Sequence, residues 1–245
     1  MTKAFYTLKS ETSKNKLSYL WWVIEPILYM SVFYLVFGML LKRGGENYIP
    51  YLLVGLVAFQ WFAKTCQSCS SSILQGKNLL LNININPLFF PLVNIVVCSI
   101  RQIPVFLMLF IFLLIYGYSI TEKWIILPVV IFIELMVITS ISIIPALIVP
   151  YLRDVGQLVP TFIQFMLFVS GTFIPFEDIP IRFREIFLLN PIASLLHLYR
   201  VVVIDDQWPE TNSIIYLICF SSVILLSIYI IFKGYCRNYA RLVSE

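Results

Sequence analysis

The sequence of 245 residues is poor in charge, since Asp, Glu, Lys and Arg make up only 12% of it, and it contains a single histidine, His197. Soluble domains carry about 25% charged residues. Apolar residues instead reach 60%, which excludes a water-soluble monomer. The longest connection between apolar runs, from Pro175 to Thr211, is shorter than a catalytic domain, which needs at least about 50 residues. Any ATP hydrolysis that drives this protein is therefore expected on another polypeptide.

Motifs for catalysis and for metal binding are missing as well. The sequence contains no glycine-rich phosphate loop, no pair of histidines for zinc and no Gly-x-Ser-x-Gly nucleophile elbow. The five cysteines lie mostly in apolar runs, and their odd number favours reduced thiols over a disulfide framework. Lys and Arg are dispersed, so nucleic-acid binding has little support. We predict that this chain is not an enzyme, binds no metal and carries no cofactor of its own.

Six apolar segments predict an all-α integral membrane protein with six transmembrane helices. Hydrocarbon accepts only helices or closed barrels, and these continuous runs lack the alternation of barrel strands. The polar residues up to Tyr19 and the missing small-residue cleavage site predict that no signal peptide is removed. The expected spans cover residues 20–41, 48–63, 92–116, 124–149, 158–174 and 214–232.

The distribution of charge predicts that both termini are cytoplasmic. Cytoplasmic connections favour Lys and Arg, and the connections on the side of the two tails hold a small excess of them. The acidic residues sharpen the asymmetry, because most of them fall on the opposite side: Glu46, Glu122, Glu177, Asp178, Glu185, Asp205, Asp206 and Glu210.

Glu134 falls near the middle of the fourth expected span. A carboxylate at that depth costs about 2.5–3.5 kcal/mol on insertion scales, so it should face the bundle interior and find a partner. Arg101, in the third expected span, is the candidate partner. Two interpretations stay open for Glu134: an anchor between helices, or a group that takes part in transport.

An aromatic stripe runs along the first expected span and consists of Trp22, Tyr29, Phe33 and Phe37. Their spacing places them on one face of a helix. Flat aromatic rings can pack against sugar rings and let a chain slide along the stripe, which makes it a candidate channel lining. Contact with lipid or with neighbouring helices is the alternative.

Two cytoplasmic connections are candidates for docking a motor protein. The first runs from Gly76 to Pro87, and its asparagines and final proline favour a turn or a short helix over a strand. A simple loop, or capping of a helix, is the alternative. The candidate contact residues are Lys77, Asn78, Leu79, Leu80, Asn82, Asn84 and Pro87 in this connection, and Arg153 and Asp154 in the next one.

The outer segment 175–209 mixes prolines, charges and apolar runs that are too short to cross a membrane. Such runs predict short re-entrant or interfacial helices before the last span. The segment is either a lid over an exit or a folded loop without a gating role. The candidate gate residues are Phe176, Ile186, Asn190, Pro191 and Leu195.

Taken in order, these segments resemble the membrane subunits of ABC polysaccharide exporters, the ABC transmembrane type-2 permeases for capsule, O-antigen (lipopolysaccharide) and teichoic acid. The resemblance covers nearly the whole chain. It is carried by the motifs Leu17–Pro26 (LSYLWWVIEP), Tyr51–Phe59 (YLLVGLVAF), Leu152–Asp154 (LRD), Pro160 and Phe187–Pro191 (FLLNP).

The resemblance implies one domain over residues 1–245 and a homodimer in the bacterial inner membrane, joined to two copies of a cytoplasmic ABC ATPase that hold ATP and Mg. It also implies an amphipathic interfacial helix over 1–19, a coupling helix within 76–87 and an outer gate within 175–209. The expected cargo is a polysaccharide on a lipid carrier. An ABC permease for a small drug or lipid, and an ion-coupled secondary transporter that uses Glu134, are the alternatives.

Overall fold

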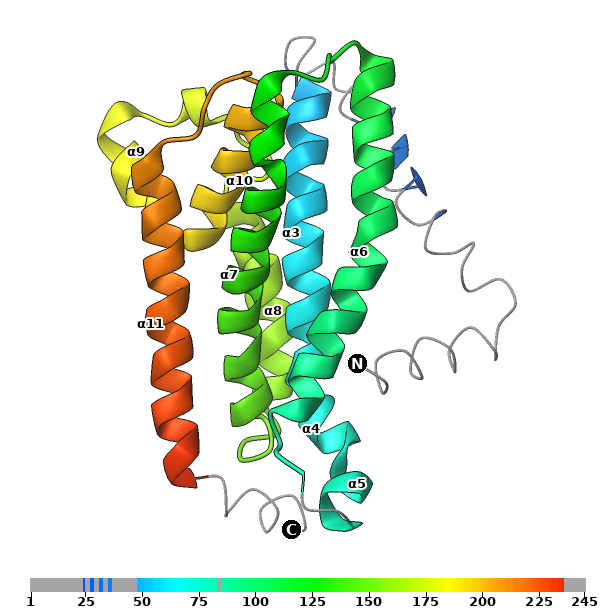
Figure 1. Ribbon diagram of the computed structural model, residues 1–245, viewed down its shortest axis with the longest axis vertical. Coiled ribbons are helices and arrows are strands. Elements are labelled where there is room, and N and C mark those ends of the chain that lie inside the picture. The colour runs from blue at the N-terminus through cyan, green and yellow to red at the C-terminus, as the bar shows by residue number, and fades with distance from the viewer. Residues whose placement is uncertain are drawn as a thin grey trace.

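Helices make up the secondary structure of the described chain (Figure 1). The computed structural model describes residues 48–82 and 85–235, together with isolated positions between residues 24 and 36. Over these residues the all-α prediction is confirmed. The expected interfacial helix 1–19 and most of the expected first span, 20–41, lie outside the described residues.

Four helices of the described chain are long and apolar enough to cross a membrane. They correspond to the second, third, fourth and last expected spans. α3 lies between α6 and α7, and α11 packs against α7 (Figure 1). The four are α3 (Tyr48–Ser70), α6 (Phe89–Tyr116), α7 (Leu127–Ile148), which the 3-10 turn η2 (Glu122–Ile126) extends, and α11 (Thr211–Tyr235).

α3 is the central helix of the bundle. Within its most apolar stretch 72% of the residues are buried inside the protein, against 11% for α11. The main core joins α3 to α6, α7 and a shorter helix, α10 (Pro191–Val203), through side chains such as Phe62, Leu109, Ile133 and Leu195. α11 therefore leaves most of its apolar side chains facing outward.

The predicted fifth span is shorter than expected. α8 (Val155–Val169) has 15 residues and is about 22 Å long, less than the roughly 30 Å of a hydrocarbon layer. It ends before Gly171, which has φ +66° and turns the chain. The apolar run 158–174 continues past the end of α8. Its composition therefore predicts a span that is too long, because it does not reveal the turn.

A bent pair of helices follows. α9 (Ile181–Leu188) and α10 make an angle of 108°, which makes the pair either a broken span or a re-entrant loop. The structure thus contains four spans in the described residues, or five if the bent pair counts as one. The predicted short re-entrant helices before the last span correspond to this pair.

The two predicted functional connections lie at opposite ends of the bundle (Figure 1). α4 (Ser72–Gln75), α5 (Lys77–Asn82) and the turn between α7 and α8 occupy one end, here called the α5 end. α9, the α6–α7 connection and the α10–α11 loop occupy the other, the α9 end.

Candidate functional site

The predicted channel residues divide between the described and the undescribed chain. Trp22, Tyr29, Phe33 and Phe37 lie outside the described residues. Glu134, on α7, is fully buried and accepts a hydrogen bond from the hydroxyl of Tyr199 on α10. This partner on α10 is 65 residues away in sequence, and the pairing of Glu134 with Arg101 stays a prediction.

The surroundings of this pair are those of a packed core. The ring of Phe106 on α6 stacks on Tyr199 at 6.0 Å between centroids, and Trp61 on α3 meets Phe106 edge-on at 5.9 Å. Oε1 of Glu134 is buried without a hydrogen-bond partner among the described residues. The hydrogen bond from Tyr199 joins α7 to α10 within this core, which fits the interpretation of Glu134 as an anchor between helices.

Arg200, the next residue on α10, is the centre of a second buried polar group. Its guanidinium is 3% exposed, and Nη1 donates to the Tyr51 hydroxyl at 3.0 Å and to the Gly171 carbonyl at 2.9 Å. Nη2 donates to the Thr172 carbonyl at 2.9 Å, and Nε to the Tyr51 carbonyl at 3.3 Å. The charge is thus solvated by backbone and hydroxyl oxygens, as a cation inside a membrane protein requires.

Tyr51 completes this group, here called the Arg200 anchor (Arg200, Tyr51 and the carbonyls of Gly171 and Thr172). The guanidinium carbon lies 3.7 Å from the centre of the Tyr51 ring, a cation–π contact. The Tyr51 hydroxyl also accepts from the amide of Phe176 at 2.9 Å. The anchor therefore ties the start of α3, the α8–α9 turn and α10 together.

Two glycines make room for the anchor. A Cβ on Gly55 would lie 2.3 Å from Nη2 of Arg200 and 2.9 Å from its Cζ. Gly171 has φ +66°, and a Cβ there would lie 2.4 Å from Cζ of Phe187 on α9. Glycine at both positions lets α3 approach α10 and lets the α8–α9 turn pass under α9.

Sequence reasoning missed the anchor. The sequence analysis includes Tyr51 and Gly55 only within the motif Tyr51–Phe59 and gives Arg200 no role. The signal was available, because an arginine within the apolar stretch Leu195–Val203 needs a buried partner. The sequence does not identify that partner, because Tyr51 lies 149 residues away from Arg200.

The candidate gate residues have different roles in the structure. Asn190 caps α10 by accepting a hydrogen bond from the Ile192 amide at 3.0 Å, and Pro191 occupies the first turn, so both shape the bend. Phe176 packs on the ring of His197 at 4.2 Å between centroids. Leu195 is a core residue at 1% exposure and Ile186 is exposed. α10 is therefore the fixed half of the pair, and α9 is the exposed half.

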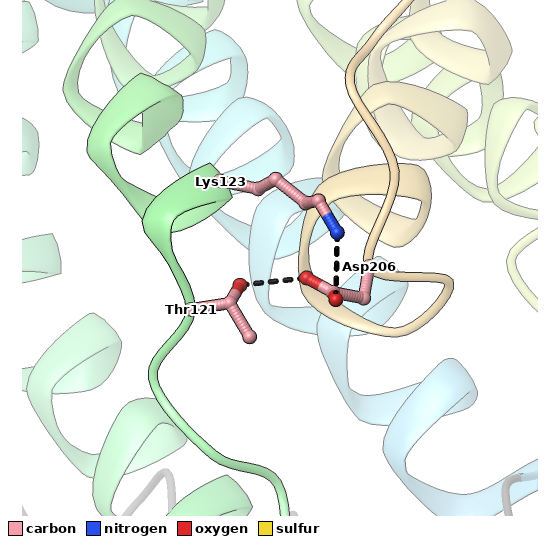
Figure 2. Close-up of polar contacts among 3 residues, drawn as sticks. All are labelled: Thr121, Lys123 and Asp206. Atoms are coloured by element: carbon pink, nitrogen blue, oxygen red, sulfur yellow. Dashed lines mark hydrogen bonds and ion pairs between the residues drawn. The ribbon is translucent and has the colours of Figure 1, made fainter.

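A polar group of three side chains at the α9 end joins two connections (Figure 2). Lys123 donates to Oδ2 of Asp206 at 2.7 Å, and the Thr121 hydroxyl donates to Oδ1 at 2.6 Å. These two hydrogen bonds, that of Lys123 first, hold the pKa of Asp206 below its usual value. We call these three residues the Asp206 latch, and it holds the α10–α11 loop against the start of η2.

At the α5 end, the predicted docking residues include both buried and exposed side chains. Leu80 is buried with Ile73 and Phe90 in a second apolar cluster, and Pro87 is buried as well. The predicted short helix is confirmed as α5, and Asn84 lies outside the described residues. The exposed predicted residues are Asn78, Asn82, Arg153 and Asp154. Lys77 and Leu79 are half-buried.

α8 presents a face that the sequence did not predict. Gln157, Thr161 and Gln164 are exposed at helical spacing. Exposed phenylalanines flank them, at positions 162, 165 and 168. Amides and a hydroxyl beside aromatic rings form a surface that can both hydrogen-bond and stack. Within residues 48–82 and 85–235, no three His, Cys, Asp or Glu side chains are grouped closely enough to hold a metal ion.

Comparison with known proteins identifies relatives over most of the chain. Residues 8–204 match the model of a family described as "ABC-2 type transporter". The chain is 24% identical over 220 residues to the O-antigen export system permease protein RfbA of Klebsiella pneumoniae, covering 89% of this chain and 84% of that protein.

Two further relatives are similar at comparable identity. The RfbA protein of Myxococcus xanthus is 25% identical over 236 residues, covering 95% of this chain and 90% of that protein. The polysialic acid transport protein KpsM of Escherichia coli is 23% identical over 224 residues, covering 89% and 86% respectively. The similarity thus extends over the anchor, the bent pair and the α5 end.

Proposed function

The chain belongs to the ABC-2 type transporter family, and on this premise we propose that it is the permease subunit of an ATP-driven exporter of a lipid-linked polysaccharide. It is a multi-pass protein of the bacterial inner membrane and is not itself the catalytic component. The observation that carries the proposal is the similarity, over at least 84% of each relative named above, to permeases whose names specify O-antigen or polysialic acid.

The proposed path of the polymer follows the exposed face of α8. A sugar chain in hydrocarbon would lose several kcal/mol for each unpaired hydroxyl. Gln157, Thr161 and Gln164 offer hydrogen bonds, and the neighbouring phenylalanines offer flat apolar surfaces for sugar rings. One helix cannot enclose a polymer, so a homodimer with two such faces, joined by the aromatic stripe of residues 22–37, completes the proposed channel.

The proposed docking site for the ATPase is the α5 end. Two copies of a separate cytoplasmic ATPase, carrying ATP and Mg, would contact Asn78 and Asn82 on α5 and Arg153 and Asp154 in the α7–α8 turn. Leu80 is buried in the same apolar cluster as Ile143 of α7. A push on α5 is therefore transmitted through packed side chains to a spanning helix.

The proposed gate is α9, at the opposite end. The Arg200 anchor holds α10 and the α8–α9 turn against α3, so movement is restricted to the exposed α9. Six spans with both termini in the cytoplasm, the topology assumed here, place α5 inside and α9 outside. The anchor then acts as the fixed frame of the gate.

Export and docking are tested with a double variant at exposed asparagines, Asn78→Asp and Asn82→Asp. We expect loss of surface polysaccharide, accumulation of glycan in the cytoplasm and loss of ATPase copurification, while membrane insertion is unchanged. Asn212→Asp, at an exposed position of the α9 end, is the matched control. Normal export and copurification in the double variant would remove the docking assignment. Drug sensitivity without glycan accumulation in a deletion strain would remove the polysaccharide assignment.

A further inference from the structure

α9 is attached to the bundle by few side chains. None of its residues is fully buried, and its half-buried ones are Arg184, Phe187 and Leu188. The ring of Phe187 lies directly on Gly171, where a Cβ would be 2.4 Å from Cζ and 3.1 Å from Cε2 of that ring. The centre of the Phe187 ring is 6.3 Å from that of Phe176. Gly171 and the Phe176 ring are here called the Phe187 socket.

The Arg200 anchor fixes both parts of this socket. Nη1 of Arg200 donates to the Gly171 carbonyl, and the Phe176 amide donates to the Tyr51 hydroxyl, each at 2.9 Å. The Phe176 ring also packs on His197 of α10 at 4.2 Å between centroids. Because the socket is bonded to α3 and α10, it belongs to the packed bundle.

The segment 177–188, here called the α9 flap, is fixed at both ends. At one end the amide of Phe176 is bonded to the anchor. At the other end the Tyr216 hydroxyl of α11 donates to the carbonyl of Leu189, the residue after Leu188. Movement of the flap is therefore limited to the residues between these two points, which include most of α9.

Arg184 contributes mainly to the internal structure of the flap. Its Nε donates to the Ile179 carbonyl and its Nη2 to the Glu177 carbonyl, both at 2.9 Å. Its guanidinium carbon also lies 5.2 Å from the centre of the Phe176 ring. A cation–π contact near solvent contributes less than burial of an aromatic ring, so Phe187 is the main attachment of the flap to the bundle.

We propose that Phe187 holds the proposed gate closed. With its ring in the socket the α9 flap is docked, and when the ring leaves, the flap opens while α10 and the anchor stay in place. A helix of eight residues is not stable by itself in water, so an undocked α9 unfolds. The inference rests on the proposed function for the role of α9 as a gate, whereas the docking contact is a property of the fold.

The test is hydrogen–deuterium exchange of the full chain in lipid nanodiscs, because amides that exchange only on local opening report how often the flap is undocked. Phe187→Ala loses about half of the transfer free energy of a phenylalanine side chain. We expect the amides of residues 181–188 to exchange about tenfold faster, which is about 1.4 kcal/mol, and those of α10 to be unchanged. Phe183→Ala is the matched control: it makes the same change in helix propensity at a position that is 47% exposed on the same helix.

Two outcomes would overturn the proposal. The first is exchange of α9 in Phe187→Ala within about twofold of the native rate. The second is faster exchange in α10 together with α9, which would make Phe187 a support of the whole bundle. Phe187→Leu keeps an apolar side chain and should give a smaller increase confined to α9, and the same two outcomes decide the proposal from this variant if the alanine variant does not fold.

Export by the same variants separates this inference from the proposed function. Faster exchange of α9 in Phe187→Ala with normal surface polysaccharide would retain the docking contact and remove the assignment of α9 as the gate. Unchanged exchange would remove the docking contact, whatever the level of export.

Discussion

Substitution of Gly55 by alanine tests the Arg200 anchor directly. The new Cβ would lie 2.3 Å from Nη2 of Arg200, so the guanidinium has to move. The tip of an arginine is flexible in solvent, but here it is buried and bonded to Tyr51, Gly171 and Thr172. Displacement therefore breaks hydrogen bonds instead of moving a free side chain.

The expected magnitude follows from the bonds at risk. Nη2 and Nε donate to the carbonyls of Thr172 and Tyr51, and a hydrogen bond to a charged group contributes about 1.5–3 kcal/mol. Loss of both costs at least about 3 kcal/mol. Alanine recovers about 1 kcal/mol because it favours the helix more than glycine does. We expect Gly55→Ala to lower the free energy of unfolding by about 2 kcal/mol.

A double-mutant cycle isolates the contact. In the background Arg200→Met the clash is absent, so the same alanine should be neutral or stabilising by up to about 1 kcal/mol. The coupling between the two positions is then about 2–3 kcal/mol, measured by unfolding in mixed micelles. Gly156→Ala is the matched control, because its Cβ would meet only the Val149 side chain at 3.5 Å. Coupling below about 0.5 kcal/mol, the usual limit of additivity, would refute the reasoning.

Two further predictions concern the other polar groups. Glu134→Gln should keep export near normal, because an amide oxygen still accepts a hydrogen bond from Tyr199. Tyr199→Phe should lower the free energy of unfolding by about 1–3 kcal/mol, because it leaves a buried acceptor unpaired. Loss of export in a folded Glu134→Gln protein would instead support the interpretation of Glu134 as a group that takes part in transport. For the latch, the lowered pKa of Asp206 means that its stabilising effect is present above the carboxyl's unfolded pKa of about 3.9 and is lost as pH falls through the folded value. The difference in free energy of unfolding between the native protein and Asp206→Asn should therefore shrink as the pH falls through the folded pKa of Asp206. A difference that stays constant from about pH 7 to about pH 2.5 would contradict the role of Lys123 and Thr121.

The spans were predictable from sequence because their signal is local. A long run of apolar residues must be helical in hydrocarbon, so α3, α6, α7 and α11 fall where composition placed them. Boundaries were less accurate where a helix continued through polar residues, as α3 does from Ala63 to Ser70. Four of these eight residues are buried in the bundle, and packing there compensates for their polarity: Thr65, Cys66, Cys69 and Ser70.

The polar contacts between helices were not predictable. The position of Glu134 within a span predicts a buried partner, but the hydroxyl that donates to it belongs to Tyr199 on α10, and the sequence does not give the position of α10. The apolar run 158–174 predicts a longer helix than α8, because the turn at Gly171 depends on a close approach to Phe187. Both features depend on contacts between different segments of the chain.

The sequence alone determined that this chain is a helical, multi-pass membrane protein without catalytic motifs, because the cost of exposing backbone and charge to hydrocarbon depends on composition and run length. Only the tertiary structure decided that α10 returns into the bundle at 108° to α9. It also decided that two adjacent residues of α10 find their partners on other helices, with Tyr199 bound to Glu134 and Arg200 bound to Tyr51. Buried polar groups must be satisfied by whatever oxygen the fold brings within about 3 Å, and that neighbour is a property of packing.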